Sequence, residues 1–420
     1  MELKKYKLAD IGKVITGKTP STSIAENYAC GTIPFYTPED VAKGLGMKGR
    51  NNRFITQTGF EEIASNTITG ESVLVGCIGS DMGNVAYSNI TCATNQQINS
   101  ITQFINGVEP LYVYYLLSTM KPYFQKIAGS TTTPILPKSV FEEIEIHLPD
   151  IKIQKDVASI LYALDHKIEL NQQINDNLEA MAKQLYDYWF VQFDFPNEEG
   201  KPYKSSGGAM VWNDKLKREI PEGWYAENIC KIANILSGGT PSKAVDEYWN
   251  NGTIPFFGPT DCNGSVFQIK TADHITQKGL EHCASSLFEE GIVIITARGS
   301  IGKLVIVGTP MAMNQSCYAL QSKEGEYEYL YFLTTQLIDC LKAKGSGSVF
   351  KSIIASDIEH SALCIATDNV VSDFCKKVKP MFEKLKANTI EIAELTKQRD
   401  ELLPLLMNGQ ATVNYHLSDD

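Results

Sequence analysis

The sequence predicts an α+β protein with two strand-rich domains in a pseudo-two-fold arrangement, separated by two long antiparallel coiled-coil helices. Three observations predict this fold. Short motifs recur about 220 residues apart, so the chain is a tandem duplication. Each copy begins with a part rich in Gly, Pro, Thr and Asn that contains short β-type runs. Each copy ends in a long stretch with heptad spacing.

Four collinear pairs of motifs define the duplication. They are GKTPS at 17–21 and GGTPS at 238–242, GTIPFYTPED at 31–40 and GTIPFFGPTD at 252–261, Gly79-Ser80 and Gly299-Ser300, and Asn95-Gln96 and Asn314-Gln315. The period is far longer than that of solenoid repeats, so each copy is a full domain with its connector.

The first part of each copy, 1–149 and 222–366, is predicted to be a strand-rich domain. Apolar β-type runs at 72–78, 292–296 and 303–307 are bounded by turn residues. One short helix is expected in each copy, over 111–126 and 328–344.

The second part of each copy, 150–195 and 367–420, is predicted to be a long helix. Residues 154–190 contain no Gly or Pro, and Pro149 precedes them. Seam residues step alternately by four and three, as in a coiled coil. They are Val157, Leu161, Leu164, Ile168, Asn171, Leu178 and Leu185 in the first helix, and Val378, Leu385, Asn388, Ile392, Leu395 and Leu402 in the second.

A helix with one seam needs a partner, and the chain supplies two such helices. Each joins a similar domain, so an antiparallel intramolecular pair about 55 Å long is expected. Asn residues in mid-seam would fix the register at some cost in stability. The alternative is that each helix packs as an ordinary amphipathic helix on its own domain. Residues 196–221, rich in Pro, Gly, Ser and charge, are interpreted as a connector.

Composition limits the class of protein. Hydrophobic residues make up 43%, and 38 Lys and Arg against 49 Asp and Glu give a net charge of −11. The acidic balance by itself argues against a nucleic acid partner. No apolar run suits a membrane helix, and the N-terminus lacks a secretory h-region. Ten cysteines without any Cys-x-x-Cys indicate reduced thiols in a cytoplasmic protein.

Motifs for catalysis fail on inspection. Residues 12–19 match a phosphate-binding loop, but Pro20 follows at once, and the second copy lacks the first Gly and the Lys. The G-x-G-x-x-G at 44–49 has no strand before it and a basic segment after it. The His residues are isolated from other metal ligands. No catalytic residue, metal site or cofactor is therefore predicted.

Polar and basic residues around the repeated loops are the candidate binding residues. Such side chains, with bare Gly N–H groups, suit contact with phosphates and base edges. The candidates are Lys18, Thr19, Ser21, Tyr36, Thr37, Arg50, Arg53, Ser80, Gln96, Gln97, Ser242, Lys243, Thr260, Arg298, Ser300, Lys303, Gln315, Ser346 and Lys351. Since neither copy is basic overall, any such surface must be local.

Further motifs accompany the repeated G-x-T-P-S and G-T-I-P-F segments, and they are LYDYWFVQFDFP at 185–196, IPEGW at 220–224, and QRDELLPLLMNGQ at 398–410. Through these motifs the whole chain resembles the specificity subunit of type I restriction–modification systems. The resemblance implies two target-recognition domains, each reading one half of a bipartite site in double-stranded DNA. The helices would set the spacer between the halves and dock methyltransferase subunits, and through them motor-nuclease subunits. The subunit itself would be non-catalytic, since methyl transfer and cleavage belong to its partners.

Two other functions remain open at this point. One is a duplicated protein-interaction scaffold without a role in DNA binding. The other is a nucleotide-binding enzyme that uses Lys18.

Overall fold

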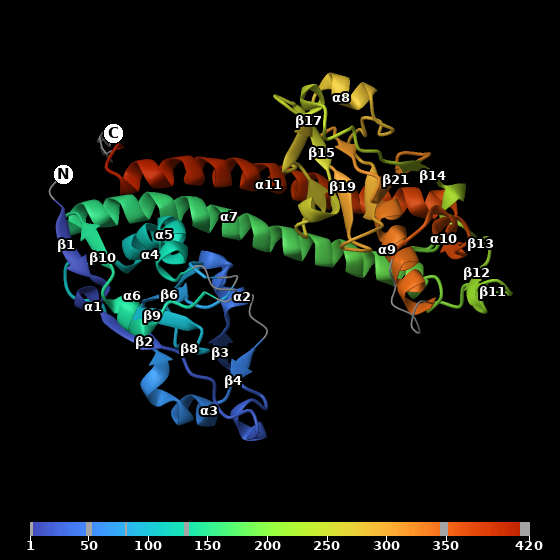
Figure 1. Cartoon of the computed structure of the whole chain (residues 1–420). Helices are drawn as coiled ribbons and strands as arrows, with labels where there is room; N and C mark the ends of the chain where they lie inside the picture. Colours follow the sequence, from blue (N-terminus) through green and yellow to red (C-terminus); the bar gives the residue numbers. More distant parts are fainter. Residues whose placement is uncertain (1–2, 48–52, 80–81, 130–133, 345–351, 412–420) are drawn as a thin grey trace, which may run out of the picture. The chain divides into compact units, whose positions relative to one another are not determined.

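The computed structural model describes residues 3–47, 53–79, 82–129, 134–344 and 352–411. The chain divides into two compact units, of which unit 1 is Met1–Leu170 with Glu394–Asp420 and unit 2 is Asn171–Ala393. Each unit therefore combines one copy of the strand-rich part with one segment from each long helix (Figure 1).

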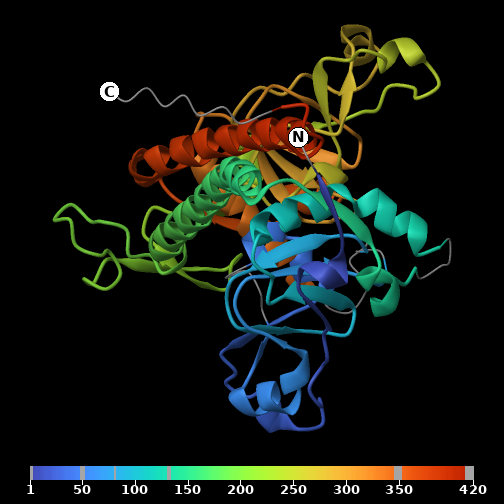
Figure 2. The same ribbon diagram turned by 90° about the vertical axis from the view of Figure 1, so that its left-hand side faces the viewer.

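Unit 1 contains two four-stranded sheets. The main sheet has the order β2-β9-β6-β7 and the smaller one β4-β3-β8-β5, while β1 pairs with β10. The strands are β1 (Lys4–Lys7), β2 (Lys13–Thr16), β3 (Ile33–Tyr36), β4 (Phe54–Ile55), β5 (Thr67–Ile68), β6 (Ser72–Gly76), β7 (Val85–Ser88), β8 (Cys92–Thr94), β9 (Ile98–Thr102) and β10 (Glu145–Leu148). The short helices are α1 (Leu8–Ile11), α2 (Pro38–Val41), α3 (Gln57–Glu62), α4 (Pro110–Thr119), α5 (Lys121–Ile127) and α6 (Lys138–Glu142). In Figures 1 and 2 the lobe that carries α3 and β4 lies at the end of unit 1 remote from α7.

Unit 2 repeats this plan. Its main sheet has the order β14-β21-β18-β19-β16 and its smaller sheet β17-β15-β20, while β13 pairs with β22 and β11 with β12. The strands are β11 (Met210–Asn213), β12 (Arg218–Pro221), β13 (Tyr225–Glu227), β14 (Ala233–Ser237), β15 (Ile254–Phe257), β16 (Phe267–Gln268), β17 (Asp273–Ile275), β18 (Val293–Thr296), β19 (Leu304–Val307), β20 (Ala312–Met313), β21 (Cys317–Ser322) and β22 (Leu363–Ile365). The helices are α8 (Gln277–Glu281), α9 (Tyr327–Lys344) and α10 (Ala355–Glu359).

The duplication seen in the sequence is a duplication of topology. Strands β2, β9, β6 and β7 correspond to β14, β21, β18 and β19. Each domain is closed by pairing of its first and last strands, with Lys4 opposite Leu148 and Tyr225 opposite Ile365. The predicted mixed fold with duplicated domains is therefore confirmed. The predicted short helix of the first copy is two helices, α4 and α5, because Pro122 at the start of α5 restarts the backbone pattern.

Two long helices complete both units. Helix α7 (Ile151–Tyr186) continues into a π-helical turn (Asp187–Val191), and α11 spans Asp368–Met407. In unit 2, Asn171 Nδ2 donates to Glu391 Oε2 at 2.8 Å, and Asn388 Nδ2 donates to Asn175 Oδ1 at 2.9 Å. Partners that advance along α7 recede along α11, so the predicted antiparallel pairing within the chain is confirmed. Helix α11 also runs through Pro380 and past Pro404, although proline disfavours the interior of a helix.

The helices pack on each other and on the strand-rich domains. Of the predicted seam, Val157, Leu161, Ile168, Asn171, Val378, Leu385 and Asn388 are buried, whereas Leu164, Leu178, Leu185, Ile392, Leu395 and Leu402 are half-buried. In unit 2 the buried helix residues also include Tyr186 and Phe382, which are not among the predicted seam positions. A helix with two packing neighbours needs a wider apolar face than an a/d seam. The alternative of one helix per domain is wrong, because α7 and α11 each contribute to the cores of both units.

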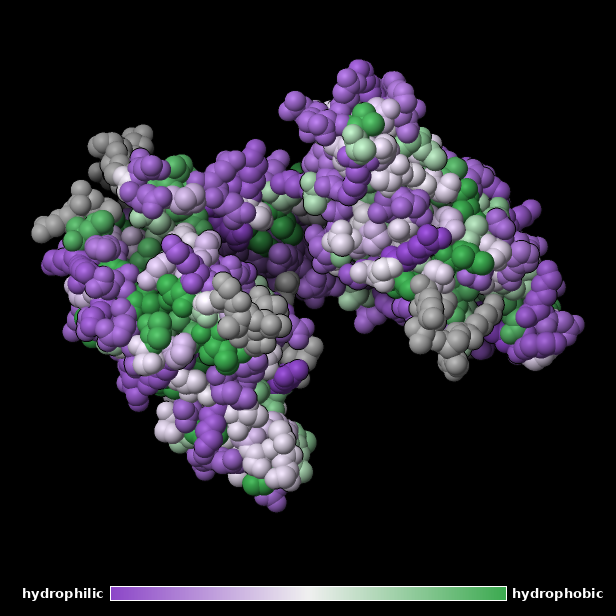
Figure 3. Space-filling model, in the orientation of Figure 1, coloured by the Kyte–Doolittle hydropathy of each residue, from purple (hydrophilic) through white to green (hydrophobic). Residues whose placement is uncertain are grey.

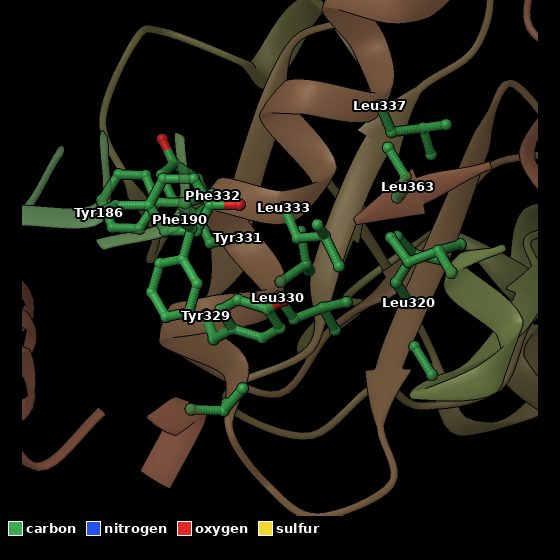
Figure 4. Close-up of a cluster of buried hydrophobic side chains, with 14 of the residues drawn as sticks. Tyr186, Phe190, Leu320, Tyr329, Leu330, Tyr331, Phe332, Leu333, Leu337 and Leu363 are labelled. Atoms are coloured by element: carbon green, nitrogen blue, oxygen red, sulfur yellow. The ribbon is translucent and has the colours of Figure 1, made fainter. Parts of the chain in front are cut away.

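The core of unit 2 is an aromatic cluster around the end of α7 (Figure 4). Tyr186, Phe190, Tyr329 and Phe332 meet there, and the ring of Phe190 lies 5.0 Å from that of Phe374 on α11. The connector 196–221 contributes as well, since its hairpin β11–β12 places Ile220 in this core. Among the described residues, no helix combines the length and apolar character that crossing a membrane requires.

Candidate nucleic-acid interface

In each unit, three loops lie at the same end of the strands of the main sheet. In unit 2, β14 and β18 flank the antiparallel strand β21, with Ser237 opposite Tyr318 and Thr296 opposite Cys317. The ends of β14 and β18 and the start of β21 therefore meet. In unit 1, Thr16 and Gly76 lie opposite Asn99 and Ile98 in the same way. We call these loops the loop edge, which is 17–21, 77–79 and 95–97 in unit 1, and 238–242, 297–300 and 314–316 in unit 2.

The first repeated glycine brings two of these loops together. A Cβ at Gly17 would lie 2.2 Å from the carbonyl oxygen of Asn95, and one at Gly238 would lie 2.2 Å from that of Asn314. Real Cβ atoms do not approach backbone this closely, so only glycine fits either position. The first glycine of the Gly-x-Thr-Pro-Ser motif is therefore explained by the turn against which it packs.

The same approach lets a threonine reach a glutamine in both units. Thr19 Oγ1 donates to Gln96 Oε1 at 2.9 Å, and Thr240 Oγ1 donates to Gln315 Oε1. Both glutamines are exposed. Within the described residues neither Gln NH₂ group has a protein acceptor. Each NH₂ group can therefore donate two hydrogen bonds to a ligand, while the bond from the threonine fixes the position of the glutamine side chain.

An aromatic residue supports the second half of the same loop. Tyr28 Oη donates to the carbonyl oxygen of Pro20 at 2.6 Å, and Trp249 Nε1 donates to that of Ser242 at 3.1 Å. Lys243 Nζ lies 5.5 Å from the centre of the Trp249 ring. The motif search missed both aromatics, although they occupy equivalent positions of the repeat and could have been found by aligning the two copies.

Cationic side chains lie on or near the loop edge. Lys18 and Arg298 are exposed on it, and Lys243, directly after it, is also exposed. Lys303 lies just beyond it, and its Nζ donates to the carbonyl oxygen of Cys262 at 3.2 Å. Arg53 is exposed beside β4 in the smaller sheet of unit 1. In Figure 3 the lobe around α8 in unit 2 is mostly hydrophilic.

The remaining described candidates differ in exposure. Ser242 and Thr260 are exposed, whereas Ser21, Gln97 and Ser300 are half-buried and engaged in local hydrogen bonds. Four further candidates, Arg50, Ser80, Ser346 and Lys351, lie outside the described residues.

Two candidates are part of the core of unit 1. Tyr36 is 1% exposed, and burial raises the pKa of its phenol. Thr37 caps α2, where its backbone N–H and Oγ1 both donate to Asp40 Oδ2. Both side chains are buried, so neither has the exposed surface that the predicted contact with a ligand requires.

The nucleotide-binding alternative lacks its structural setting. Strand β2 (Lys13–Thr16) occupies the middle of the 12–19 segment, and the next helical turn begins only at Ala25. A phosphate-binding loop needs the strand before the motif and the helix directly after it. Among the described residues, no three His, Cys, Asp or Glu side chains gather as a metal site requires.

A duplicated recognition scaffold is the class that these loop edges and paired helices define, and comparison with known proteins identifies the family. A family model described as "Type I restriction modification DNA specificity domain" matches residues 1–180 and 221–365. The MjaIX type I restriction enzyme specificity subunit of Methanocaldococcus jannaschii is 30% identical over 97% of this chain and 93% of that protein. The HindI specificity subunit of Haemophilus influenzae is 25% identical over 73% of this chain and 78% of that protein.

A solved structure supports the fold. The S subunit of a type I restriction–modification system from M. genitalium superposes with a TM-score of 0.61 at 15% identity, covering 99% of this chain and 97% of that one. The chain therefore belongs to the type I restriction–modification specificity family. It is a specificity subunit, a DNA-recognition component and not an enzyme.

Proposed function

We propose that each unit reads one half of a bipartite site in double-stranded DNA through its loop edge. The observation that carries this proposal is the repeated Thr–Gln pair, which holds Gln96 and Gln315 exposed at equivalent places. A glutamine side chain can bond the adenine edge in the major groove through two hydrogen bonds. The nearby Lys18, Lys243 and Arg298 supply charge for phosphate contacts.

In this proposal the target-recognition domains are 1–149 and 222–366, and the connector 196–221 links the first helical segment to the second domain. The helical segments 150–195 and 367–420 set the spacer between the two half-sites. With 36 residues, α7 is about 54 Å long, or about one and a half turns of DNA. The same helices dock methyltransferase subunits, and motor-nuclease subunits join through the complex. No cofactor is needed by this subunit.

Mapping of methylated sites tests the assignment of the glutamines. The subunit is expressed with its methyltransferase partner, and genomic methylation is compared for wild type, Gln96→Ala and Gln315→Ala. Each variant should relax base preference in one half-site only, by about 5- to 150-fold, since a bidentate contact is worth about 1–3 kcal/mol. Gln125→Ala is the matched control, because Gln125 is exposed on α5 and is not one of the loop-edge residues.

Two outcomes would contradict the proposal. If the wild-type complex methylates no bipartite sequence, the function is wrong. If each glutamine variant changes both half-sites, the assignment of one half-site to each unit is wrong. A further check is one heptad inserted into both helices, which should change the spacer and leave the bases of the half-sites unchanged.

A further inference from the structure

A partly buried ion pair, in which the carboxylate of Asp165 is buried and the side chain of Arg399 is 29% exposed, lies between the two long helices in unit 1. Arg399 Nη1 on α11 donates to Asp165 Oδ1 on α7 at 2.7 Å. The second carboxylate oxygen, Asp165 Oδ2, accepts from Tyr115 Oη on α4 at 2.8 Å. Asp165 is 7% exposed and Tyr115 is 2% exposed. One carboxylate therefore joins three helices, including one from the strand-rich domain.

The hydrogen bonds and charges of this network stabilise the protonated forms of Arg399 and Tyr115. Burial by itself would lower the pKa of the Arg399 guanidinium, but the hydrogen bond and charge of Asp165 raise it above its ordinary value. Burial, and then the charge of Asp165, raise the pKa of the Tyr115 phenol, so it stays protonated and can donate. Arg399 Nε and Nη2 also donate to Asp400 Oδ1, at 3.0 and 2.7 Å, which orients the guanidinium.

The network fits only one register of the helices. On α11, the seam positions next to Arg399 are occupied by Leu395 and Leu402. The positions one heptad before and after Arg399 are occupied by Ile392 and Leu406. Any slip that preserves the apolar seam would place one of these side chains against Asp165. A buried carboxylate without a partner is strongly disfavoured, so the pair selects the observed register.

Unit 2 has no such ion pair at the comparable place among its described residues. There α9 meets the long helices through aromatic rings, with Phe332 lying 5.9 Å from Phe382 and 6.4 Å from Phe374, and through a hydrogen bond from Tyr331 Oη to Glu179 Oε1 at 3.2 Å. Apolar contacts tolerate small shifts better than a buried charge does. Polar contacts that favour one register lie in both units, since Asn171–Glu391 and Asn388–Asn175 also join α7 to α11 in unit 2, but the charged pair lies in unit 1.

We propose that Asp165 and Arg399 are positioning residues that fix the register of α7 against α11 and thereby limit the DNA spacer to one length. This proposal rests on the proposed function. A slip of one helical turn moves a helix by about 5.4 Å, which is about one and a half base pairs at 3.4 Å each. Relaxed register should therefore appear as spacers altered by one or two base pairs.

The test uses the double variant Asp165→Leu/Arg399→Leu in the complex with the methyltransferase partner. Replacing both charges with apolar side chains keeps the core packed and leaves no unpaired charge. Wild type should methylate a single spacer length. The double variant should also methylate the same half-sites at altered spacers, at least 10-fold more often than wild type does.

The matched control is Lys397→Ala/Glu401→Ala, which removes an exposed ion pair from the same part of α11. It should keep the wild-type spacer. If the double leucine variant keeps one spacer with unchanged half-sites, the positioning role is wrong and the proposed function stands. If wild type shows no bipartite site, the proposed function has failed first.

If the double variant no longer methylates DNA, a second measurement tests the register of the helices directly. Spin labels carried by non-natural amino acids at positions 166 and 397, both exposed, report the distance between the helices in the purified full chain. The double variant should show a distribution broadened by about 5 Å, one turn of helix. A single narrow distance identical to that of the charged protein would overturn the proposal.

Discussion

The glycine at the start of the loop edge offers a sharp test of how this surface is built. In Gly238→Ala the new Cβ would lie 2.2 Å from the carbonyl oxygen of Asn314 and 2.5 Å from that of Met313. Because real Cβ atoms stay beyond 3.0 Å, the backbone of one loop must move by roughly 0.8 Å. Strain of this kind typically costs about 1–3 kcal/mol.

Gly258→Ala is the matched control for this substitution. A Cβ at Gly258 would also approach Asn314, but it would meet the flexible side-chain Nδ2 at 3.2 Å, and Gly258 has an ordinary φ of −129°. This variant should stay within about 0.5 kcal/mol of wild type.

Thermal unfolding followed by circular dichroism measures both variants. For a unit of this size, each kcal/mol lowers Tm by about 2–4 °C, so Gly238→Ala should lose roughly 2–12 °C. Gly238→Ala should also weaken the recognition of one half-site, because the contact between Thr240 and Gln315 depends on the same approach. If both alanine variants are as stable as wild type, the close approach does not limit this position and the reasoning is refuted.

Three further predictions concern the core, the cationic loop and pH. Phe374→Ala removes a fully buried ring and should destabilise unit 2 by about 3–5 kcal/mol in urea unfolding, and a loss below 1 kcal/mol would argue against the aromatic core. Lys243→Ala should weaken DNA binding about equally for all sequences and reduce the salt slope by about 1, and an altered base preference would contradict a phosphate contact. Burial raises the pKa of Glu328 above its ordinary value of 4.5, so the folded protein binds this proton more tightly than the unfolded chain does. The contribution of Glu328 to the free energy of unfolding therefore falls as the pH rises above 4.5. Glu328→Gln should therefore raise Tm at pH 7 but not at pH 4, and an equal gain for the exposed Glu324→Gln would refute burial as the cause.

The two long helices were predictable because their signals are local. A stretch without Gly or Pro and a repeated step of four and three residues depend on neighbours along the chain. Their antiparallel pairing followed from the duplication. The ends of the helices were less predictable, since α11 tolerates Pro380 and Pro404 where tertiary packing outweighs local preference.

The loop edge was predictable only in part. The repeated motifs located Thr19, Gln96, Thr240 and Gln315, but they could not separate exposed from buried polar residues. Tyr36 was selected beside them and lies in the core. Exposure depends on which face of a strand is covered by another sheet, and that information is not local.

The sequence by itself determined the duplication, the class of fold and the seam of the paired helices, because each is written as a pattern along the chain. Only the tertiary structure decided which residues distant in the sequence contact each other. Antiparallel strands bring Thr19 to Gln96, and the helix pair brings Asp165 to Arg399. Such contacts depend on strand order and helix register, which are set by the packing of the whole unit and not by neighbouring residues.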